Sequence, residues 1–145
     1  SKYINEDNLY INTDFDKVID IAKRRNIQVV ERPSHLAGDK VWTQPVINHT
    51  EDELGGLDDE DIIVILQANS PQITSEKIDE CIDMLIDNDL FEVHTIDSTM
   101  INNGAIQVIK RKVREQKGKV CYNGVVMADW IDVHTIEDVN KIGEL

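Results

Sequence analysis

The chain has 145 residues, of which 41% are hydrophobic and 30% are charged, so we expect a globular protein with a single domain over residues 1–145. Its formal net charge of −13 repels phosphate backbones, which excludes nucleic acid as the expected partner but leaves room for a nucleotide in a locally basic pocket. No apolar run approaches the roughly 20 residues of a membrane span, and Cys81 and Cys121 lack metal-type spacing, so we expect reduced cysteines in a cytoplasmic protein away from membranes.

The first part of the chain predicts a strand, a helix and a second strand. Residues 8–12 have the composition of a short strand, and Thr13 or Asp14 is placed to cap the helix that follows. This helix has a single apolar stripe at Phe15, Val18, Ile19 and Ala22. Residues 27–31 predict the next strand, which Pro33 ends. We thus expect a strand–helix–strand unit at this end of the chain.

The middle of the chain contains an acidic segment and then a continuous apolar run. We expect residues 51–61, EDELGGLDDED, to form a solvated surface loop. The run Asp61–Gln67, DIIVILQ, has the composition of a central parallel strand covered on both faces. Thr74 or Ser75 should cap the next helix, whose apolar positions are Ile78, Cys81, Ile82 and Leu85.

The last part of the chain predicts three more strands and a final helix. The strands are expected at residues 92–96, 104–110 and 119–127. The final helix begins at Thr135, because Asp138 three residues later completes a capping-box pattern.

Alternating strands and helices indicate an α/β fold, which we expect to have three layers: a mainly parallel sheet flanked by helices. Ligands of such sheets lie beyond the carboxyl ends of the strands. We therefore expect the segments that follow the strands to converge on one rim, namely residues 12–14, 32–33, 67–71 and 132–135.

Several of these segments are similar to motifs of a known family. The stretch YINTDFDKVIDIAKRRNIQVVERPSHLAGD at 10–39 resembles the second-strand region of acylneuraminate cytidylyltransferases (CMP-sialic acid synthetases). ILQANSP at 65–71, NNGAIQV at 102–108 and WIDVHTIEDV at 130–139 resemble three later motifs of that family, in the same order. The resemblance implies a nucleotide-diphospho-sugar transferase-like fold, truncated in this chain.

The resemblance also implies a reaction, that of a nucleotidyltransferase in CMP-sugar biosynthesis. Such a transferase moves CMP from CTP to a sialic-type 2-keto sugar acid. The anomeric hydroxyl attacks the α-phosphorus, pyrophosphate leaves and a CMP-sugar forms. The protein mainly positions the groups and neutralises charge, with Mg²⁺ or alternatively Mn²⁺ as the cofactor. The implied partners are CTP, the sugar acid and a second copy in a homodimer.

The resemblance places the nucleotide against the strand-end residues. Arg32 would contact it as a catalytic and nucleotide-binding residue, because a guanidinium is a rigid fork of donors for phosphate; the alternative is a surface arginine at a strand end. The other predicted nucleotide-binding residues are Thr13, Asp14, Gln67, Asn69 and Ser70. For Gln67 to Ser70 the alternative is turn chemistry and helix capping alone.

Two further residues are expected to bind the sugar acid. Asn103 matches the asparagine of the family that touches the acceptor, but Asn103-Gly104 would also suit a turn that opens a strand. Gln107 stands where relatives usually have tyrosine, which weakens the acceptor role.

Asp132 and His134 stand in place of the Asp-x-Asp metal pair of the family. Residues two apart on a strand point the same way, so both can reach one ion. Asp132 suits Mg²⁺, and we expect it to be a catalytic metal ligand, whereas imidazole suits Mn²⁺ or zinc better. The alternative for His134 is a surface or capping histidine.

The chain also departs from the family pattern. It has no basic, glycine-containing loop for the triphosphate, and its link from Phe91 to Asn102 is much shorter than the insertion that builds the acceptor pocket in relatives. We therefore expect these 145 residues alone to lack measurable transferase activity. The alternative function is a non-catalytic, truncated domain that binds a nucleotide or serves in assembly.

Overall fold

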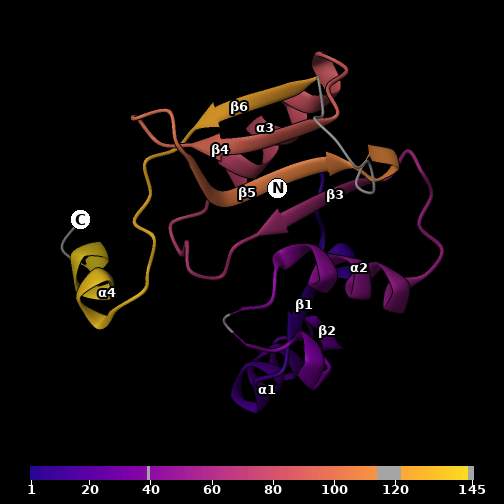
Figure 1. Cartoon of the computed structure of the whole chain (residues 1–145), viewed down its shortest axis with the longest axis vertical. Coiled ribbons are helices and arrows are strands. Elements are labelled where there is room, and N and C mark those ends of the chain that lie inside the picture. Colours follow the sequence, from indigo (N-terminus) through magenta and orange to yellow (C-terminus); the bar gives the residue numbers. More distant parts are fainter. Residues whose placement is uncertain (39, 114–121, 144–145) are drawn as a thin grey trace. The chain divides into compact units, whose positions relative to one another are not determined.

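The computed structural model describes residues 1–38, 40–113 and 122–143. They form an α/β fold with two separate β-sheets (Figure 1). The chain divides into two compact units, Lys2–Leu57 and Asp58–Leu145, the second of which includes Ser1. The single domain expected from the sequence stays a prediction. Cys121, Asp39 and the first part of the strand expected at 119–127 lie outside the described residues.

The Lys2–Leu57 unit is built on a two-stranded parallel sheet. Its elements in chain order are the 3-10 turn Glu6–Asn8, β1 (Tyr10–Thr13), α1 (Asp16–Arg24), β2 (Gln28–Glu31), the 3-10 turn Ser34–Leu36 and α2 (Thr43–Leu54). β1 and β2 pair from Tyr10↔Gln28 to Thr13↔Glu31. α1 contacts both strands, with Val18 and Ile19 half-buried and Ala22 fully buried. Phe15, which was expected in the same apolar stripe, is instead 58% exposed, because it lies at the N-cap position before the helix. The strand–helix–strand unit expected from the sequence is confirmed.

The start of α1 differs from the expected capping. Asp14 does not cap the helix; the N-cap position is Phe15, and no side chain accepts a hydrogen bond from the first turn. Thr13 instead accepts the amide of Phe15 through its Oγ1, at 3.2 Å. The strand-to-helix turn is therefore held one residue before the helix, which leaves Asp14 exposed.

The helix α2 was missed from the sequence, and the solvated loop expected at residues 51–61 is wrong for its first part. Residues 51–54 form the last turn of α2, and Glu51 is buried there, with 7% exposed. The sequence pattern for a helix is weak here, because Pro45 lies in the first turn of α2 and three acidic residues lie in its last turn. Proline is tolerated in a first helical turn, where the amide is not needed for the helix.

The Asp58–Leu145 unit contains a four-stranded sheet in the order β3-β5-β4-β6. Its strands are β3 (Ile62–Leu66), β4 (Glu92–Ile96), β5 (Asn102–Lys110) and β6 (Asn123–Met127). β5 is antiparallel to both β3 and β4, whereas β4 and β6 are parallel, so the sheet is mixed. The prediction that residues 61–67 form a central parallel strand is wrong for this sheet, since β3 lies at its edge.

The antiparallel pairing of β4 and β5 follows from their short connection. Residues 97–101 join the two strands, whereas a parallel crossover needs a dozen or more residues. Asp97 organises the turn, because its Oδ1 accepts the amides of Thr99 and Ile101, at 2.8 and 3.1 Å. Composition alone did not reveal this reversal.

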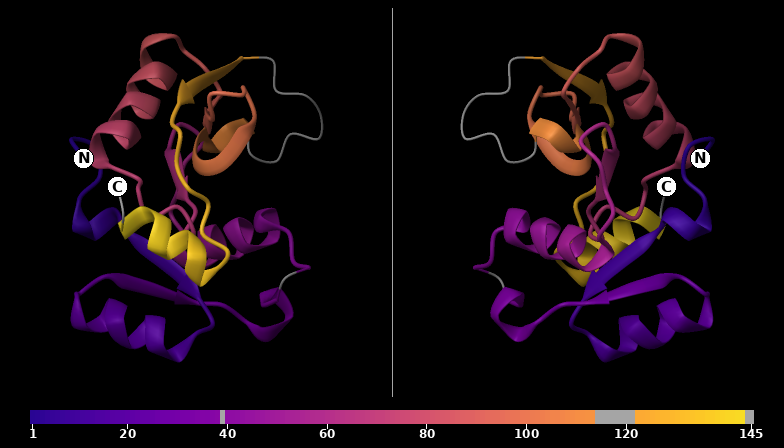
Figure 2. Two further views of the ribbon diagram at one scale, coloured as in Figure 1. Left: turned by 90° about the vertical axis from the view of Figure 1, so that its left-hand side faces the viewer. Right: turned by 90° about the vertical axis from the view of Figure 1, so that its right-hand side faces the viewer.

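The core of this unit lies between the sheet and α3 (Ser75–Asp87), which contacts β4, β5 and β6 (Figure 2). Thr74 caps α3 by accepting the amide of Lys77, one of the two alternatives expected. The apolar positions expected on α3 are all buried. The largest fully buried side chains are Leu85, Ile106, Val93, Val108, Val126, Thr95 and Cys81.

The last described helix, α4 (Ile136–Gly143), confirms the capping box expected at Thr135. Asp138 Oδ2 accepts the amides of His134 and Thr135, and Thr135 Oγ1 accepts the amide of Asp138. The contact with Lys141 and then the bond from Thr135 hold the pKa of Asp138 well below its usual value. Among the described helices, none is long and apolar enough to cross a membrane.

Candidate functional site

Most of the predicted site residues of the Asp58–Leu145 unit lie at the side of the four-stranded sheet where three of its strands end. β5 is antiparallel to β3 and β4, and β6 is parallel to β4, so β3, β4 and β6 run the same way (Figure 1). Their carboxyl ends therefore lie on the same side of the sheet, together with the amino end of β5. At this side, beyond the carboxyl ends of the strands, α/β sheets usually bind ligands.

At this side of the sheet Asn69 joins the turn that follows β3 to the segment that follows β6. Its Nδ2 donates a hydrogen bond to Oδ1 of Asp132, and its carbonyl accepts the amide of Val133 at 2.8 Å. Gln72 Oε1 accepts the amide of Ile131, also at 2.8 Å. The turn after β3 thus holds the segment that follows β6 on both sides of Asp132, and the two segments converge as expected.

Asp132 and His134 also meet, as their spacing predicted. His134 Nε2 lies 2.7 Å from Asp132 Oδ2, with 69% and 48% of the two side chains exposed. They are not on a strand, however, because β6 ends at Met127 and residues 128–134 form a connection to α4. Both carboxylate oxygens of Asp132 therefore already have a partner in the protein.

These contacts limit the metal that the site could hold. Within residues 1–38, 40–113 and 122–143, no group of three or more His, Cys, Asp or Glu side chains is placed to bind an ion. Mg²⁺ is often held by one or two carboxylates with substrate phosphates and water. Asp132 suits such a shared site but not a metal held by the protein alone, and His134 already contacts one of its carboxylate oxygens.

Ser70 is less accessible than a nucleotide contact requires. Only 4% of the residue is exposed. Its amide donates to the carbonyl of Gln67 at 3.1 Å, and its carbonyl accepts the amide of Ile73 at 3.2 Å. This burial argues against the nucleotide role and favours the turn role that we considered beside it. Gln67 remains half-buried, and its amide continues the β3–β5 ladder to Ala105.

The side chain of Asn103 makes three hydrogen bonds inside the protein. Its Oδ1 accepts the hydroxyl of Thr95 at 2.6 Å and the amide of Ala105 at 3.2 Å, and its Nδ2 donates to the carbonyl of Ala128 at 2.7 Å. It lies where the β4–β5 register shifts, next to Gly104 at φ +69°. Asn103-Gly104 is therefore an irregularity within β5 rather than the turn that opens the strand.

Gln107 lies farther along β5, opposite Ile65 of β3 and His94 of β4. Its Nε2 donates to Oε1 of Glu92 at 2.8 Å. It is thus part of a cross-strand pair inside the sheet, four residues away from Asn103 along the strand. The sequence signal that joined Gln107 to Asn103 was the family motif, not a shared contact.

The Lys2–Leu57 unit has its own polar cluster at the strand ends. Arg32 donates from Nε to Oδ1 of Asn12 at 2.7 Å and from Nη2 to the carbonyl of Asn12 at 2.8 Å. Asn12 Nδ2 in turn donates to Oγ1 of Thr50 at 2.8 Å. The guanidinium is therefore half-buried in a fixed orientation, and its Nη1 has no hydrogen-bond partner in the described part of the chain.

Thr13 lies beside Arg32, since the amide of Arg32 donates to the carbonyl of Thr13 at 2.9 Å. The strand ends 12–14 and 32–33 thus converge within this unit, as expected. That these two segments share one rim with residues 67–71 and 132–135 stays a prediction. His49 was not expected near these strand ends; its Nδ1 lies 3.5 Å from Asn12 Nδ2, and it comes from α2, the helix that the sequence analysis missed.

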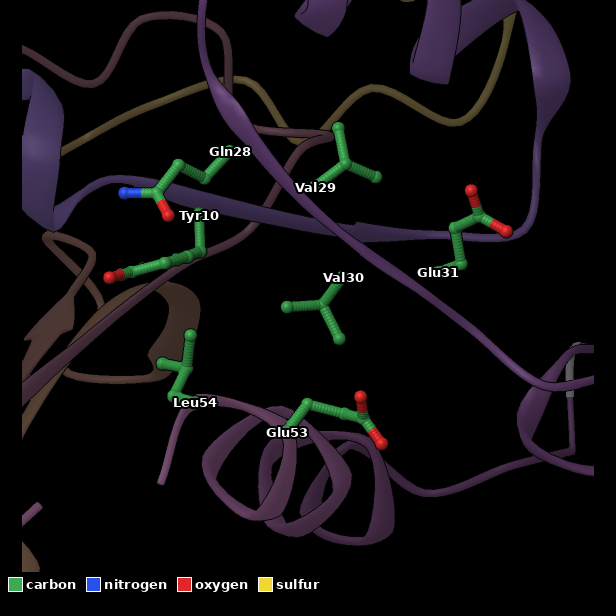
Figure 3. Close-up of a pocket in the computed structure, with 7 residues that line it drawn as sticks. All are labelled: Tyr10, Gln28, Val29, Val30, Glu31, Glu53 and Leu54. Atoms are coloured by element: carbon green, nitrogen blue, oxygen red, sulfur yellow. The ribbon is translucent and has the colours of Figure 1, made fainter. Parts of the chain in front are cut away.

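The same unit has a pocket of about 400 Å³ between its sheet and α2. Val30 points toward the helix, with Tyr10 and Gln28 at one end and Glu31 and Glu53 at the other (Figure 3). The lining residues are Tyr10, Gln28, Val29, Val30, Glu31, Glu53 and Leu54. None of the predicted nucleotide-binding residues lines it, and its glutamates would repel phosphate.

No protein-family model matches the chain, and no curated protein matches it either.

Proposed function

We propose that the chain is a cytidylyltransferase-type domain that binds CTP at its strand ends, with a sialic-type sugar acid as the acceptor. The observation that carries the proposal is the hydrogen bond from Asn69 to Asp132. It unites ILQANSP and WIDVH, two motifs on which the resemblance to acylneuraminate cytidylyltransferases depends. The finer fold that goes with this proposal is a three-layer, mainly parallel sheet in a cytoplasmic protein.

In this proposal each retained group has a defined task. Arg32, held by Asn12, would offer its unpartnered Nη1 to a phosphate oxygen, which suits a rigid guanidinium. Asp132 would share Mg²⁺ or Mn²⁺ with the phosphates. A bound cation polarises the phosphate oxygens toward attack by the anomeric hydroxyl of the sugar. Asn69 would orient Asp132 rather than touch the reacting atoms.

Thermal unfolding with nucleotides tests the proposal. A ligand that binds only the folded state raises its stability, by about 2.7 kcal/mol at a hundred times Kd. We expect CTP with Mg²⁺ or Mn²⁺ to raise the melting temperature and ATP or GTP to leave it unchanged. Arg32→Lys keeps the positive charge but loses the forked guanidinium, and should reduce the rise in melting temperature caused by CTP. Arg24→Lys, on the exposed face of α1, is the matched control and should not.

A non-catalytic binding or assembly module is the second candidate, and the contacts of Asn103 favour it. A side chain that already makes hydrogen bonds to Thr95, Ala105 and Ala128 has little left for an acceptor sugar. The burial of Ser70 also favours the non-catalytic candidate. We expect this chain to release no measurable pyrophosphate from CTP and a sialic-type acid.

Pyrophosphate release and thermal unfolding together separate the two candidates. Pyrophosphate released by these 145 residues would refute the expected inactivity and support the enzyme directly. A CTP-specific rise in melting temperature without pyrophosphate release is the expected result for the binding module. If neither CTP nor another nucleotide changes the melting temperature, nucleotide binding by this chain is excluded and only the assembly role remains.

A further inference from the structure

β3 is an edge strand made entirely of aliphatic residues, Ile62-Ile63-Val64-Ile65-Leu66. Natural edge strands are usually protected by lysine, proline, a bulge or a very short length. β3 has none of the first three, and its pairing with β5 is regular over its whole length. Its end residues Ile62 and Leu66 are 36% and 39% exposed. The strand has the composition of one that is paired on both sides.

The backbone groups of β3 alternate between β5 and the open edge. The amide of Gln67 donates to the carbonyl of Ala105 at 3.0 Å, and that of Arg111 donates to the carbonyl of Asp61 at 2.8 Å. In an antiparallel ladder these bonds recur at every second residue, so the groups of Ile62, Val64 and Leu66 point away from β5. In the part of the chain that the structure describes, these outward groups have no backbone partner.

We propose that this edge pairs with β3 of a second copy, antiparallel and about a twofold axis at Val64. In that register Val64 lies opposite Val64 of the second copy, and Ile62 lies opposite Leu66. Each of the outward residues then exchanges both of its backbone hydrogen bonds with the other copy. The cross-strand neighbours are all aliphatic, which stabilises antiparallel sheets. The edge is thus complementary to itself, as a twofold interface requires.

The charges around β3 favour the antiparallel arrangement over a parallel one. The acids Asp58, Asp59, Glu60 and Asp61 immediately precede the strand. Antiparallel pairing places the two acidic runs at opposite ends, roughly 20 Å apart at the usual rise per residue and beyond the Debye length in physiological salt. An in-register parallel pair would place them side by side.

Part of this acidic charge is also balanced inside each copy. Arg111 Nη1 lies 3.3 Å from a carboxylate oxygen of Asp59, and Lys112 Nζ lies 2.8 Å from one of Glu60. These basic residues directly follow β5, which pairs with β3, so each copy has them beside the start of its own β3. The formal charge of −13 per chain still opposes association, and we therefore expect a dimer that becomes stronger as salt is added.

Sedimentation equilibrium of the whole chain over a range of concentrations and salt tests the proposal. We expect a reversible dimer of twice the 16.5 kDa chain mass. Val64→Pro removes an amide that faces the second copy without touching the ladder to β5, and should weaken the dimer roughly tenfold to thirtyfold. Val64→Ala keeps the amide and is the matched control. Both variants are checked for folding by circular dichroism.

A charge pair tests the register independently and does not need proline in the strand. Ile62→Lys alone and Leu66→Glu alone should each weaken the dimer. The double variant I62K/L66E places an introduced ammonium opposite an introduced carboxylate at both ends of the antiparallel pair, and should recover dimerisation. In a parallel pair the introduced charges would face their own kind, and no recovery would follow.

Amide hydrogen exchange gives a readout for each residue. Protection of Ile62, Val64 and Leu66 should rise with protein concentration, whereas Ile63 and Ile65 should be protected at every concentration. A chain that stays monomeric at millimolar concentration overturns the proposal. So does a dimer that survives Val64→Pro unchanged, or one for which the double variant is no tighter than the single ones.

Discussion

Asn69 donates a hydrogen bond to Asp132 across 63 positions of the sequence. The same residue accepts the amide of Val133, so one asparagine holds both the side chain of Asp132 and the backbone beside it. The bond fixes one carboxylate oxygen, while His134 approaches the other. Asn69 and His134 together therefore hold the carboxylate of Asp132 in one orientation.

Replacing Asn69 by alanine should loosen the segment between β6 and α4. The loss of a hydrogen bond to a charged group of this exposure should cost about 1 kcal/mol of the free energy of unfolding. It should also increase proteolytic cleavage within residues 128–135, because the bond to Asp132 no longer restrains that connection. Urea unfolding and limited thermolysin digestion, which can cleave at Ile131 and Val133, measure the two effects.

Asn140→Ala is the matched control for this change, since Asn140 is exposed on α4. Equal cleavage rates in the two variants would show that Asn69 does not hold the segment. Restored protection in Asn69→Gln would contradict a role that depends on the short asparagine side chain.

The fully buried hydroxyl of Thr95 connects two strands and Asn103. It accepts the amide of Ile106 at 3.1 Å and donates to Oδ1 of Asn103 at 2.6 Å. Thr95→Val keeps the shape but leaves that amide without its acceptor, so we expect a loss of about 1–3 kcal/mol in the free energy of unfolding. Asn103→Ala should cost a similar amount, and the double variant should cost less than the sum of the two.

Thr95→Ser keeps the hydroxyl and serves as the control; it should be more stable than Thr95→Val. If Asn103→Ala instead leaves the unfolding free energy unchanged, the network does not support the fold. The acceptor role predicted for Asn103 would then regain weight, because its side chain would be free to serve a ligand.

Local signals in the sequence predicted the elements well. The strand expected at 92–96 has those bounds, and the capping box of Thr135 and Asp138 forms as expected. Such features depend on residues a few positions apart. The helix α2 was missed for the same reason, since its acidic end resembles a solvated loop and only tertiary packing buries Glu51.

Pairing between distant strands was not predictable in the same way. The apolar run of β3 indicated burial on both faces, but not its place at the edge of the described sheet or its antiparallel partner. The site shows the same division. Asp132 and His134 are only two residues apart and do meet, whereas the bonds that occupy Asn103 come from Thr95 of β4 and from Ala128, which directly follows β6.

The buried thiol of Cys81 makes the stability of the fold depend on pH at high pH. Burial raises the pKa of the thiol from 9.0 to about 11, and the charge of Glu80 acts in the same direction. The unfolded chain loses its thiol proton near pH 9 and the folded chain only near pH 11. The free energy of unfolding should therefore fall as the pH rises through that window.

Urea unfolding at pH 8 and pH 10 measures this effect, in a Cys121→Ser background that leaves one thiol. Cys81→Ala should show a shallower fall than the parent between these pH values. At pH 8 iodoacetamide should alkylate Cys81 on the order of tenfold to a hundredfold more slowly in the folded chain than in urea. Equal rates would mean that the thiol is accessible in the folded state.

Gly124 of β6 lies where the sheet meets α3, and a side chain there has no room. A Cβ added to it would lie 2.6 Å from Cδ1 of Leu90, 2.8 Å from Sδ of Met84 and 3.2 Å from Cγ2 of Val93. Gly124→Ala should therefore destabilise the fold by about 1–3 kcal/mol, the usual cost of overpacking. The flexible Met84 can move aside, which favours the lower part of that range.

Gly143→Ala is the control, because nothing lies within 4 Å of a Cβ added at that position. It ends α4, where alanine favours the helix over glycine, so it should leave stability unchanged or raise it slightly. Combining Gly124→Ala with Met84→Ala should recover part of the loss if the clash with the thioether is its cause. A Gly124→Ala variant as stable as the parent would show that β6 and α3 do not pack as closely as these distances require.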